Sequence, residues 1–170
     1  EMTYWDCHTV DVLHSWHAGH PQAKAHRYFD VSASCSQLIP LGSGATMISG
    51  NASLMVVGAN ASGLDWVLDL GGPNDSTSIQ GLNAESCRGL LRTAYTESIG
   101  QCSIRDSRFS ADQMLDGAYW IDFGWAGPLR IEGVMLDAVH DKDVYIFLMS
   151  WEMGTTAIIE GNNLRTRSIP

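Results

Sequence analysis

Short runs in which apolar and polar residues alternate restrict the fold of this chain more than any other feature. Residues 25–35, 64–70 and 119–125 follow this pattern. Alternation with a period of two is typical of β-strands with one buried face. Further candidate strands lie at 45–49, 53–57 and 156–160, and residues 144–151, apolar on both faces, are expected to form a central strand. The sequence therefore predicts a domain built mainly on sheets.

One segment has helical spacing instead. Apolar and small residues recur three or four positions apart at Cys87, Leu90, Leu91, Ala94, Tyr95 and Ser98. Asn83 or Ser86 would cap this helix and Gly100 would end it, which places it at about residues 84–99. We expect an α+β fold, an antiparallel β-sheet sandwich with this one principal helix packed on a sheet. The alternative is a mainly-β sandwich or barrel.

The chain is long and apolar enough to form one core. Of its 170 residues 45% are hydrophobic, and no composition break or Pro/Ser-rich linker divides them, so residues 1–170 are expected to form a single domain. The longest nearly uncharged stretch, residues 31–64, is interrupted by Ser, Asn, Gly and Pro. It falls short of the roughly 20 apolar residues that a membrane span needs.

Four cysteines, Cys7, Cys35, Cys87 and Cys102, include no C-x-x-C pair. An even number without metal-ligand spacing predicts two disulfides. If the helix is continuous, Cys87 and Cys102 lie roughly 20 Å apart, too far for a disulfide. Two pairings remain. Cys7–Cys102 with Cys35–Cys87 is favoured over Cys7–Cys87 with Cys35–Cys102.

Three N-glycosylation sequons begin at Asn51, Asn60 and Asn74. Together with the expected disulfides, they predict a secreted, extracellular glycoprotein. The sequence starts at Glu1 with no apolar leader before it. This fits a mature form after signal-peptide removal, or a chain produced without its leader.

Charge narrows the expected partners. Ten Lys and Arg face 19 Asp and Glu, which gives a net charge of -9. Such a surface repels nucleic acid and anionic membranes at long range. We therefore expect a protein or carbohydrate partner and no nucleic acid. An oligomer or hetero-complex is compatible with the sequence.

Five of the six histidines fall between His8 and His26, and His14, His17 and His20 stand three apart. On one helical turn such imidazoles could bind zinc or copper. Gly19 and Pro21 oppose a helix through them. We expect no cofactor and an exposed polar segment here, with a metal site as the alternative.

Aromatic residues suggest a different kind of site. Trp120 lies on the opposite strand face from Tyr119 and Ile121, with Asp122 beside it. If that face is exposed, Trp120 and Asp122 form a sugar-stacking or protein-docking patch; the alternative is core packing. A nucleophile elbow is absent, and the acidic residues show no identifying catalytic spacing.

The second half resembles small secreted fungal proteins of the killer-toxin and effector type. The resemblance rests on Cys87-Arg-Gly-Leu-Leu and Ile99-Gly-Gln-Cys102 around a helix, followed by the strand Ala118–Phe123. It is confined to this stretch and implies an α/β-sandwich with the helix cysteines tied to the sheet. It assigns no functional residue.

Together these features predict a non-enzymatic secreted protein that acts by binding. It would be an effector-like or toxin-like module, or an accessory subunit of a larger secreted protein. The alternative is a secreted hydrolase or metal-dependent enzyme that uses the His-rich N-terminal segment and acidic residues.

Overall fold

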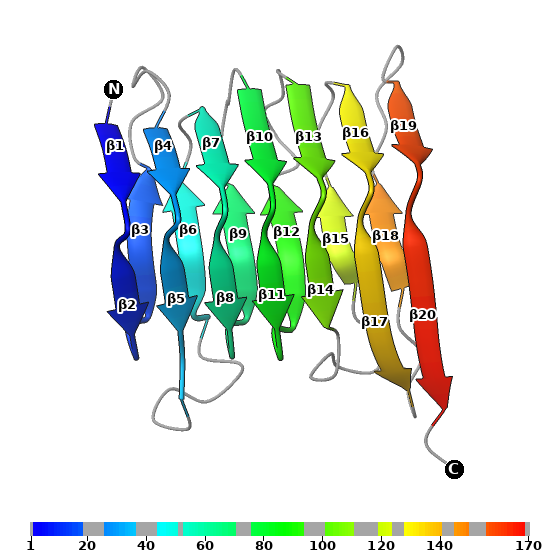
Figure 1. The fold of residues 1–170 in the computed structure, drawn as a ribbon, viewed down its shortest axis with the longest axis horizontal. Helices are drawn as coiled ribbons and strands as arrows, with labels where there is room; N and C mark the ends of the chain where they lie inside the picture. The colour runs from blue at the N-terminus through cyan, green and yellow to red at the C-terminus, as the bar shows by residue number, and fades with distance from the viewer. Residues whose placement is uncertain are drawn as a thin grey trace.

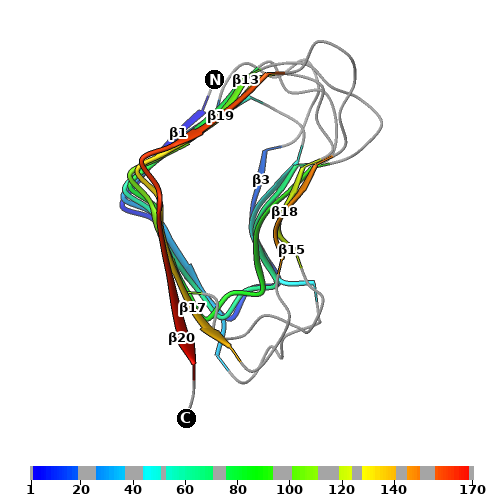
Figure 2. The same cartoon turned by 90° about the vertical axis from the view of Figure 1, so that its right-hand side faces the viewer.

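The fold is a parallel β-solenoid, seen in a computed structural model of the chain (Figure 1). The structure describes residues 2–18, 26–36, 44–50, 53–70, 76–93, 101–110, 119–123, 128–140, 145–149 and 156–168. Every regular element in these ranges is a strand. The strands form three sheets, which we call A, B and C, and Figure 2 shows them in cross-section around a common interior.

Each sheet contains every third strand. In the described ranges the last coil adds a strand to sheets A and B but none to sheet C. Sheet A contains β1 Met2–Trp5, β4 His26–Phe29, β7 Leu54–Val57, β10 Ser76–Gln80, β13 Gln101–Arg105, β16 Leu129–Glu132 and β19 Ala157–Glu160. Sheet B contains β2 His8–Val10, β5 Ser32–Ser34, β8 Asn60–Ser62, β11 Asn83–Glu85, β14 Arg108–Ser110, β17 Met135–His140 and β20 Asn163–Ser168. Sheet C contains β3 His14–Ala18, β6 Thr46–Gly50, β9 Trp66–Leu70, β12 Gly89–Thr93, β15 Tyr119–Phe123 and β18 Tyr145–Met149.

A coil is one passage through sheets A, B and C, and successive coils stack in parallel register. Tyr28 of β4, for example, pairs with Tyr4 of the coil before and with Val56 of the coil after. Equivalent residues therefore form rows that run across each sheet. The fold therefore depends on which side chains each row can accommodate, on the inner face of the sheet or on its outer face.

The corner between sheets A and B is the most regular part of the coil. It has one residue with positive φ in each coil, at positions 6, 30, 58, 81, 106, 133 and 161, all Asp or Gly. Glycine adopts this left-handed conformation without penalty, and aspartate does so more readily than most other residues. The step from one of these positions to the next is the length of one coil.

Backbone hydrogen bonds continue through this corner. Asp30 N–H donates to Val57 O at 3.0 Å, and Asn60 N–H donates to Val31 O at 2.9 Å. In later coils side chains also accept hydrogen bonds from the backbone of this corner: the Asn162 amide oxygen accepts from Val134 N–H at 2.9 Å. The corner thus carries few unpaired backbone groups into the interior.

The core is made of inward rows of apolar residues. Tyr28, Val56, Ile79, Ile104 and Ile131 form one such buried row on sheet A. On sheet C, consecutive residues such as Leu90 and Leu91 of β12 are both buried, so both faces of that strand are shielded. Sheets covered on both faces read as continuous apolar runs.

An ion pair is buried near the corner between sheets B and C. Asp65 accepts from Arg88 Nη1 at 3.0 Å through Oδ1, and from Gly44 N–H at 2.6 Å and Ala45 N–H at 3.1 Å through Oδ2. Its side chain is almost fully buried. These contacts tie three coils together.

The predicted antiparallel α+β sandwich is wrong, and so are the alternative sandwich or barrel and the sandwich implied by the resemblance. In the ranges described, the strands pair in parallel and no helix occurs. Residues 83–85 and 89–93 of the expected helix are β11 and β12, separated by a corner in which Ser86 has φ 54°. As far as Thr93 the apolar spacing reflects a strand, a corner and a second strand, and residues 94–99 of the expected helix lie outside the described ranges. Within the same ranges, no helix could span a membrane.

The predicted disulfides are also wrong, because Cys7, Cys35, Cys87 and Cys102 are free thiols. Cys87 packs in the core after the Ser86 corner, and its Sγ donates to Glu85 O at 3.4 Å. Cys102 lies in an inward row of β13, where burial raises the pKa of its thiol to about 12. Both act as small apolar core residues, and the geometric case for either pairing disappears with the helix.

Candidate functional site

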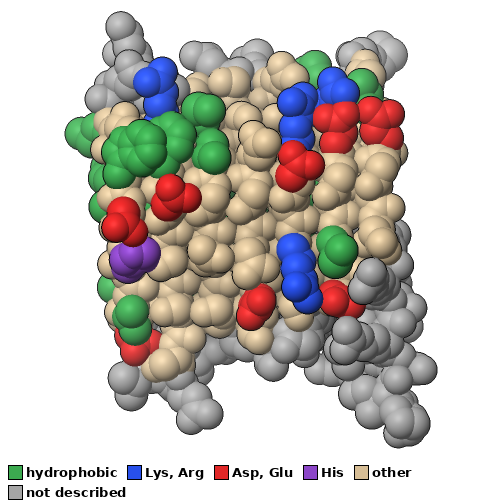
Figure 3. All heavy atoms as spheres, in the orientation of Figure 1, with side chains coloured by type: hydrophobic (Ala, Val, Ile, Leu, Met, Phe, Trp, Pro, Cys, Tyr) green, Lys and Arg blue, Asp and Glu red, His purple; other side chains and the backbone are tan. Residues whose placement is uncertain are grey.

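The outer face of sheet A carries two rows of side chains that change character along the solenoid. One row runs Trp5, Phe29, Val57, Gln80, Arg105, Glu132 and Glu160. The other runs Thr3, Arg27, Met55, Ser78, Ser103, Arg130 and Ile158. Figure 3 shows apolar side chains gathered over the first strands, with a few charged ones beside them, and a group of basic and acidic side chains over the last strands.

We call Trp5, Phe29, Met55 and Val57 the apolar patch. Trp5 and Phe29 stack face to face, with ring centroids 4.2 Å apart and planes 14° apart. Trp5 is 62% exposed and Met55 is 39% exposed. Large contiguous apolar patches are rarely exposed on soluble domains unless they are interaction sites.

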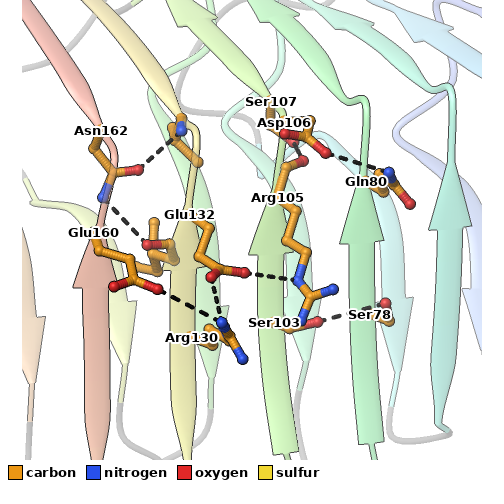
Figure 4. A network of polar contacts seen from close by, with 12 residues as sticks. Ser78, Gln80, Ser103, Arg105, Asp106, Ser107, Arg130, Glu132, Glu160 and Asn162 are labelled. Carbon is orange, nitrogen blue, oxygen red and sulfur yellow. Dashed lines mark hydrogen bonds and ion pairs between the residues drawn. The ribbon is translucent and has the colours of Figure 1, made fainter.

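We call Arg105, Arg130, Glu132 and Glu160 the charged network (Figure 4). Glu132 contacts Arg105 Nε at 3.0 Å and accepts a short hydrogen bond from Arg130 Nη2, which also lies 3.5 Å from Glu160. The hydrogen bond from Arg130 lowers the pKa of Glu132, and the same bond raises the pKa of Arg130. The shifts favour the charged forms of Arg130 and Glu132, and the ion pairs orient the side chains of the network.

Uncharged polar groups lie between the two halves. Ser78 and Ser103 oppose each other on adjacent strands with their hydroxyl oxygens 3.5 Å apart, and Gln80 donates to Asp106 at 3.2 Å. These groups offer donors and acceptors on a flat surface. The face as a whole can contact a partner with apolar, neutral polar and charged parts.

A second cluster lies at the start of sheet B. His8 Nδ1 is 2.6 Å from Ser32 Oγ, and His8 Nε2 is 3.0 Å from Asp6 Oδ1. If Nε2 donates to the carboxylate, Nδ1 is free to accept the hydroxyl proton of Ser32, the general-base arrangement of serine hydrolases with the two ring nitrogens exchanged. The cluster is open to solvent, with His8 58% and Asp6 85% exposed.

The predicted histidine site loses its geometric basis. His14 and His17 belong to strand β3, in which Cα atoms three residues apart are about 10 Å apart, instead of sharing a helical turn. Their side chains and the whole of His20 lie outside the described part of the structure. Among the residues described, no group of three His, Cys, Asp or Glu is placed to hold a metal.

The other predicted sites are tested only in part. Trp120 and Asp122 belong to β15, but their side chains lie outside the described part of the structure. Of the three sequon asparagines, Asn60 is exposed on β8, and Asn51 and Asn74 are not described.

Sequence reasoning missed both clusters on sheets A and B. Trp5, Phe29 and Val57 each precede a corner residue, Asp6, Asp30 or Gly58. Aligning the chain on these Asp and Gly corners would have brought the outward positions into one row.

No family model, curated protein or solved structure matches this chain.

Proposed function

We propose that this chain is a protein-binding module whose contact surface is the outer face of sheet A. The observation that carries the proposal is the division of that face into an exposed apolar patch and a pre-oriented charged network. Trp and Arg dominate the binding energy of many protein interfaces, and polar groups around an apolar centre supply specificity. We favour a partner whose surface pairs an apolar cluster with separate charged groups.

The scaffold suits this role. Outward side chains in each row belong to adjacent hydrogen-bonded strands, so the ladder fixes their spacing. The stack of Trp5 on Phe29 restricts both rings before any partner arrives. Pre-organised contacts lose less conformational entropy on binding than flexible ones.

We place the protein outside the cell on the sequons alone, since the free thiols no longer support that location. Asn60 is exposed on sheet B, three residues after Val57 of the apolar patch. A glycan there would lie beside the proposed contact surface.

The test compares capture by three immobilised proteins from extracellular fluid of the source organism. Met55→Asp introduces a charge into the apolar patch, and Glu85→Ala alters an exposed position on sheet B. We expect proteins retained by the wild type and by Glu85→Ala to be lost on Met55→Asp, and titration with the identified partner to show at least about tenfold weaker binding.

Equal retention by all three proteins would contradict the proposal. A glycan array provides the arm for the other expected partner class. Binding of a glycan that Met55→Asp abolishes would replace the protein partner with a carbohydrate.

A hydrolase is the second candidate, favoured by the Ser32–His8–Asp6 cluster. In this reaction Ser32 Oγ would attack an ester carbonyl as its proton passes to His8 Nδ1, and His8 would return that proton to the alcohol that leaves when the ester C–O bond breaks. Water would then hydrolyse the acyl-serine, releasing the carboxylic acid and restoring the Ser32 hydroxyl. We expect a fluorophosphonate probe to label Ser32, and Ser32→Ala to abolish both labelling and hydrolysis of an activated ester. Ser34→Ala, two residues along β5, is the matched control. Labelling that survives Ser32→Ala would exclude this function.

A further inference from the structure

Ser32 is the middle one of three outward side chains on adjacent strands of sheet B. His8, Ser32 and Asn60 pair in register from one coil to the next, which places each Cα atom about 4.8 Å from that of its neighbour. His8 Nδ1 lies 2.6 Å from Ser32 Oγ, so the base approaches the hydroxyl from β2. Asn60 stands on β8, on the opposite side of Ser32 from the base.

Attack of a hydroxyl on an ester turns the carbonyl oxygen into an oxyanion, and hydrolases provide hydrogen-bond donors for it. The backbone of Ser32 cannot provide one, because Ser32 N–H donates to Cys7 O at 2.9 Å. The rest of β5 is no better placed, since this strand is hydrogen-bonded to β2 on one side and to β8 on the other. The donor at this centre therefore has to be a side chain.

Asn60 is the side chain that fits this requirement. It is exposed, and among the described residues its carboxamide has no hydrogen-bond partner, so its two N–H groups are available to a ligand. The hydroxyls of Ser34 and Ser62 also belong to this face, but each stands two residues further along its strand, a step of about 7 Å. Asn60 alone lies directly beside Ser32 on the side away from His8.

We propose that Asn60 is a catalytic residue of the Ser32 centre and that its Nδ2–H stabilises the oxyanion. The inference rests on the hydrolase candidate described above. As Ser32 Oγ bonds to the ester carbon and its proton passes to His8 Nδ1, the carbonyl π electrons move onto oxygen, which accepts the hydrogen bond from Asn60. The carbonyl then re-forms, and the alcohol leaves with the proton from His8.

The same nitrogen is the attachment point of an N-glycan, because Asn60-Ala-Ser62 is a sequon. A glycan on Asn60 Nδ2 replaces one of its two N–H groups and places a bulky sugar beside Ser32. Glycosylation of Asn60 and hydrolysis at Ser32 therefore exclude each other. A glycosylated chain would keep the centre inactive.

The first arm of the test uses protein from a host without N-glycosylation. Ser32 Oγ bonds to the phosphorus of a fluorophosphonate as fluoride leaves, and the P=O oxygen then occupies the oxyanion position. We expect Asn60→Ala to slow labelling of Ser32 and to lower kcat for an activated ester, each at least about tenfold. Asn83→Ala is the matched control, because Asn83 is the next residue of the row, about 10 Å from Ser32. Circular dichroism establishes that both variants fold.

The second arm uses a host that attaches N-glycans. Ser62→Ala removes the sequon and keeps Asn60. We expect wild type glycosylated at Asn60 to resist labelling, and Ser62→Ala from the same host to label at the rate of the unglycosylated protein. Labelling of the glycosylated wild type at that rate, or an Asn60 that this host leaves unmodified, would overturn the exclusion.

The outcomes separate this inference from the hydrolase candidate itself. Equal labelling rates for Asn60→Ala and unglycosylated wild type would overturn the role of Asn60 and leave Ser32 as the nucleophile. Unglycosylated wild type that is not labelled at Ser32 would overturn both.

Discussion

Alanine at Gly63 should destabilise the protein far more than alanine at Gly81, although both glycines have φ of 66°. A Cβ at Gly81 meets nothing closer than Gly58 N at 3.6 Å, so the cost there is the left-handed conformation, about 1–2 kcal/mol. A Cβ at Gly63 would lie 2.2 Å from the carbonyl oxygen of Cys35. That oxygen is backbone, held in place because Cys35 N–H donates to Ser62 O at 2.9 Å.

Relieving this contact means opening the corner by about 1 Å and weakening the hydrogen bond from Gly63 N–H to Glu85 O. Loss of a buried backbone hydrogen bond adds about 1–3 kcal/mol, so we expect about 3–5 kcal/mol in total for Gly63→Ala. Equilibrium unfolding in urea, followed by far-ultraviolet circular dichroism, gives the free energies of unfolding. A Gly63→Ala value within about 0.5 kcal/mol of Gly81→Ala would refute the steric reasoning.

Three further measurements test other parts of the structure. Burial, and secondarily the positive N-terminus, lowers the pKa of His26 from 6.5, so the free energy of unfolding should fall as the pH drops below 6.5 towards that lower pKa. In His26→Phe the urea midpoint of unfolding should depend less on pH over this range. Equal pH dependence of the midpoint in the wild type and the variant would contradict this. Asp65→Ala should lower the free energy of unfolding by about 3 kcal/mol because it leaves Arg88 without its buried partner, whereas Asp69→Ala, which removes a more exposed ion pair, should lower it by under about 1 kcal/mol. Similar losses in the two variants would exclude a special role for Asp65. Without reductant, Cys87 and Cys102 should resist a thiol reagent in the native state and react after denaturation, and a peptide map that joins either one in a disulfide would contradict the free-thiol assignment.

Strand positions could be predicted from sequence far better than strand pairing. The alternation over 64–70 appears as β9 at Trp66–Leu70, and the expected strand at 53–57 appears as β7 at Leu54–Val57. Alternation reports which residues face inward, and this is the same in parallel and antiparallel sheets. The expected central strand at 144–151 is β18, the end strand of sheet C in the ranges described.

The corner residues explain why the repeat escaped detection. The signal is one Asp or Gly followed by an inward residue, and that inward residue varies among Cys7, Val31, Ser107 and others. Coil length also varies, since the step from Gly133 to Gly161 is longer than the step from Gly58 to Gly81, so no fixed period stands out. The Ser32–His8–Asp6 cluster escaped for a related reason, because Ser32 is a full coil away from His8 in sequence and beside it only in the stacked coils.

The corner row has a consequence for how such a chain can change in length. Each coil passes the corner with one residue of positive φ, so a whole coil is an exchangeable unit, whereas loss of a single residue within a strand would reverse the inward and outward faces beyond it. Removal of residues 58–80, from one glycine corner to the residue before the next, would join Val57 to Gly81 and preserve the register on both sides. Growth or shortening by duplication and deletion would therefore proceed in whole-coil steps, and each corner residue gained or lost would lengthen or shorten the stack by one coil.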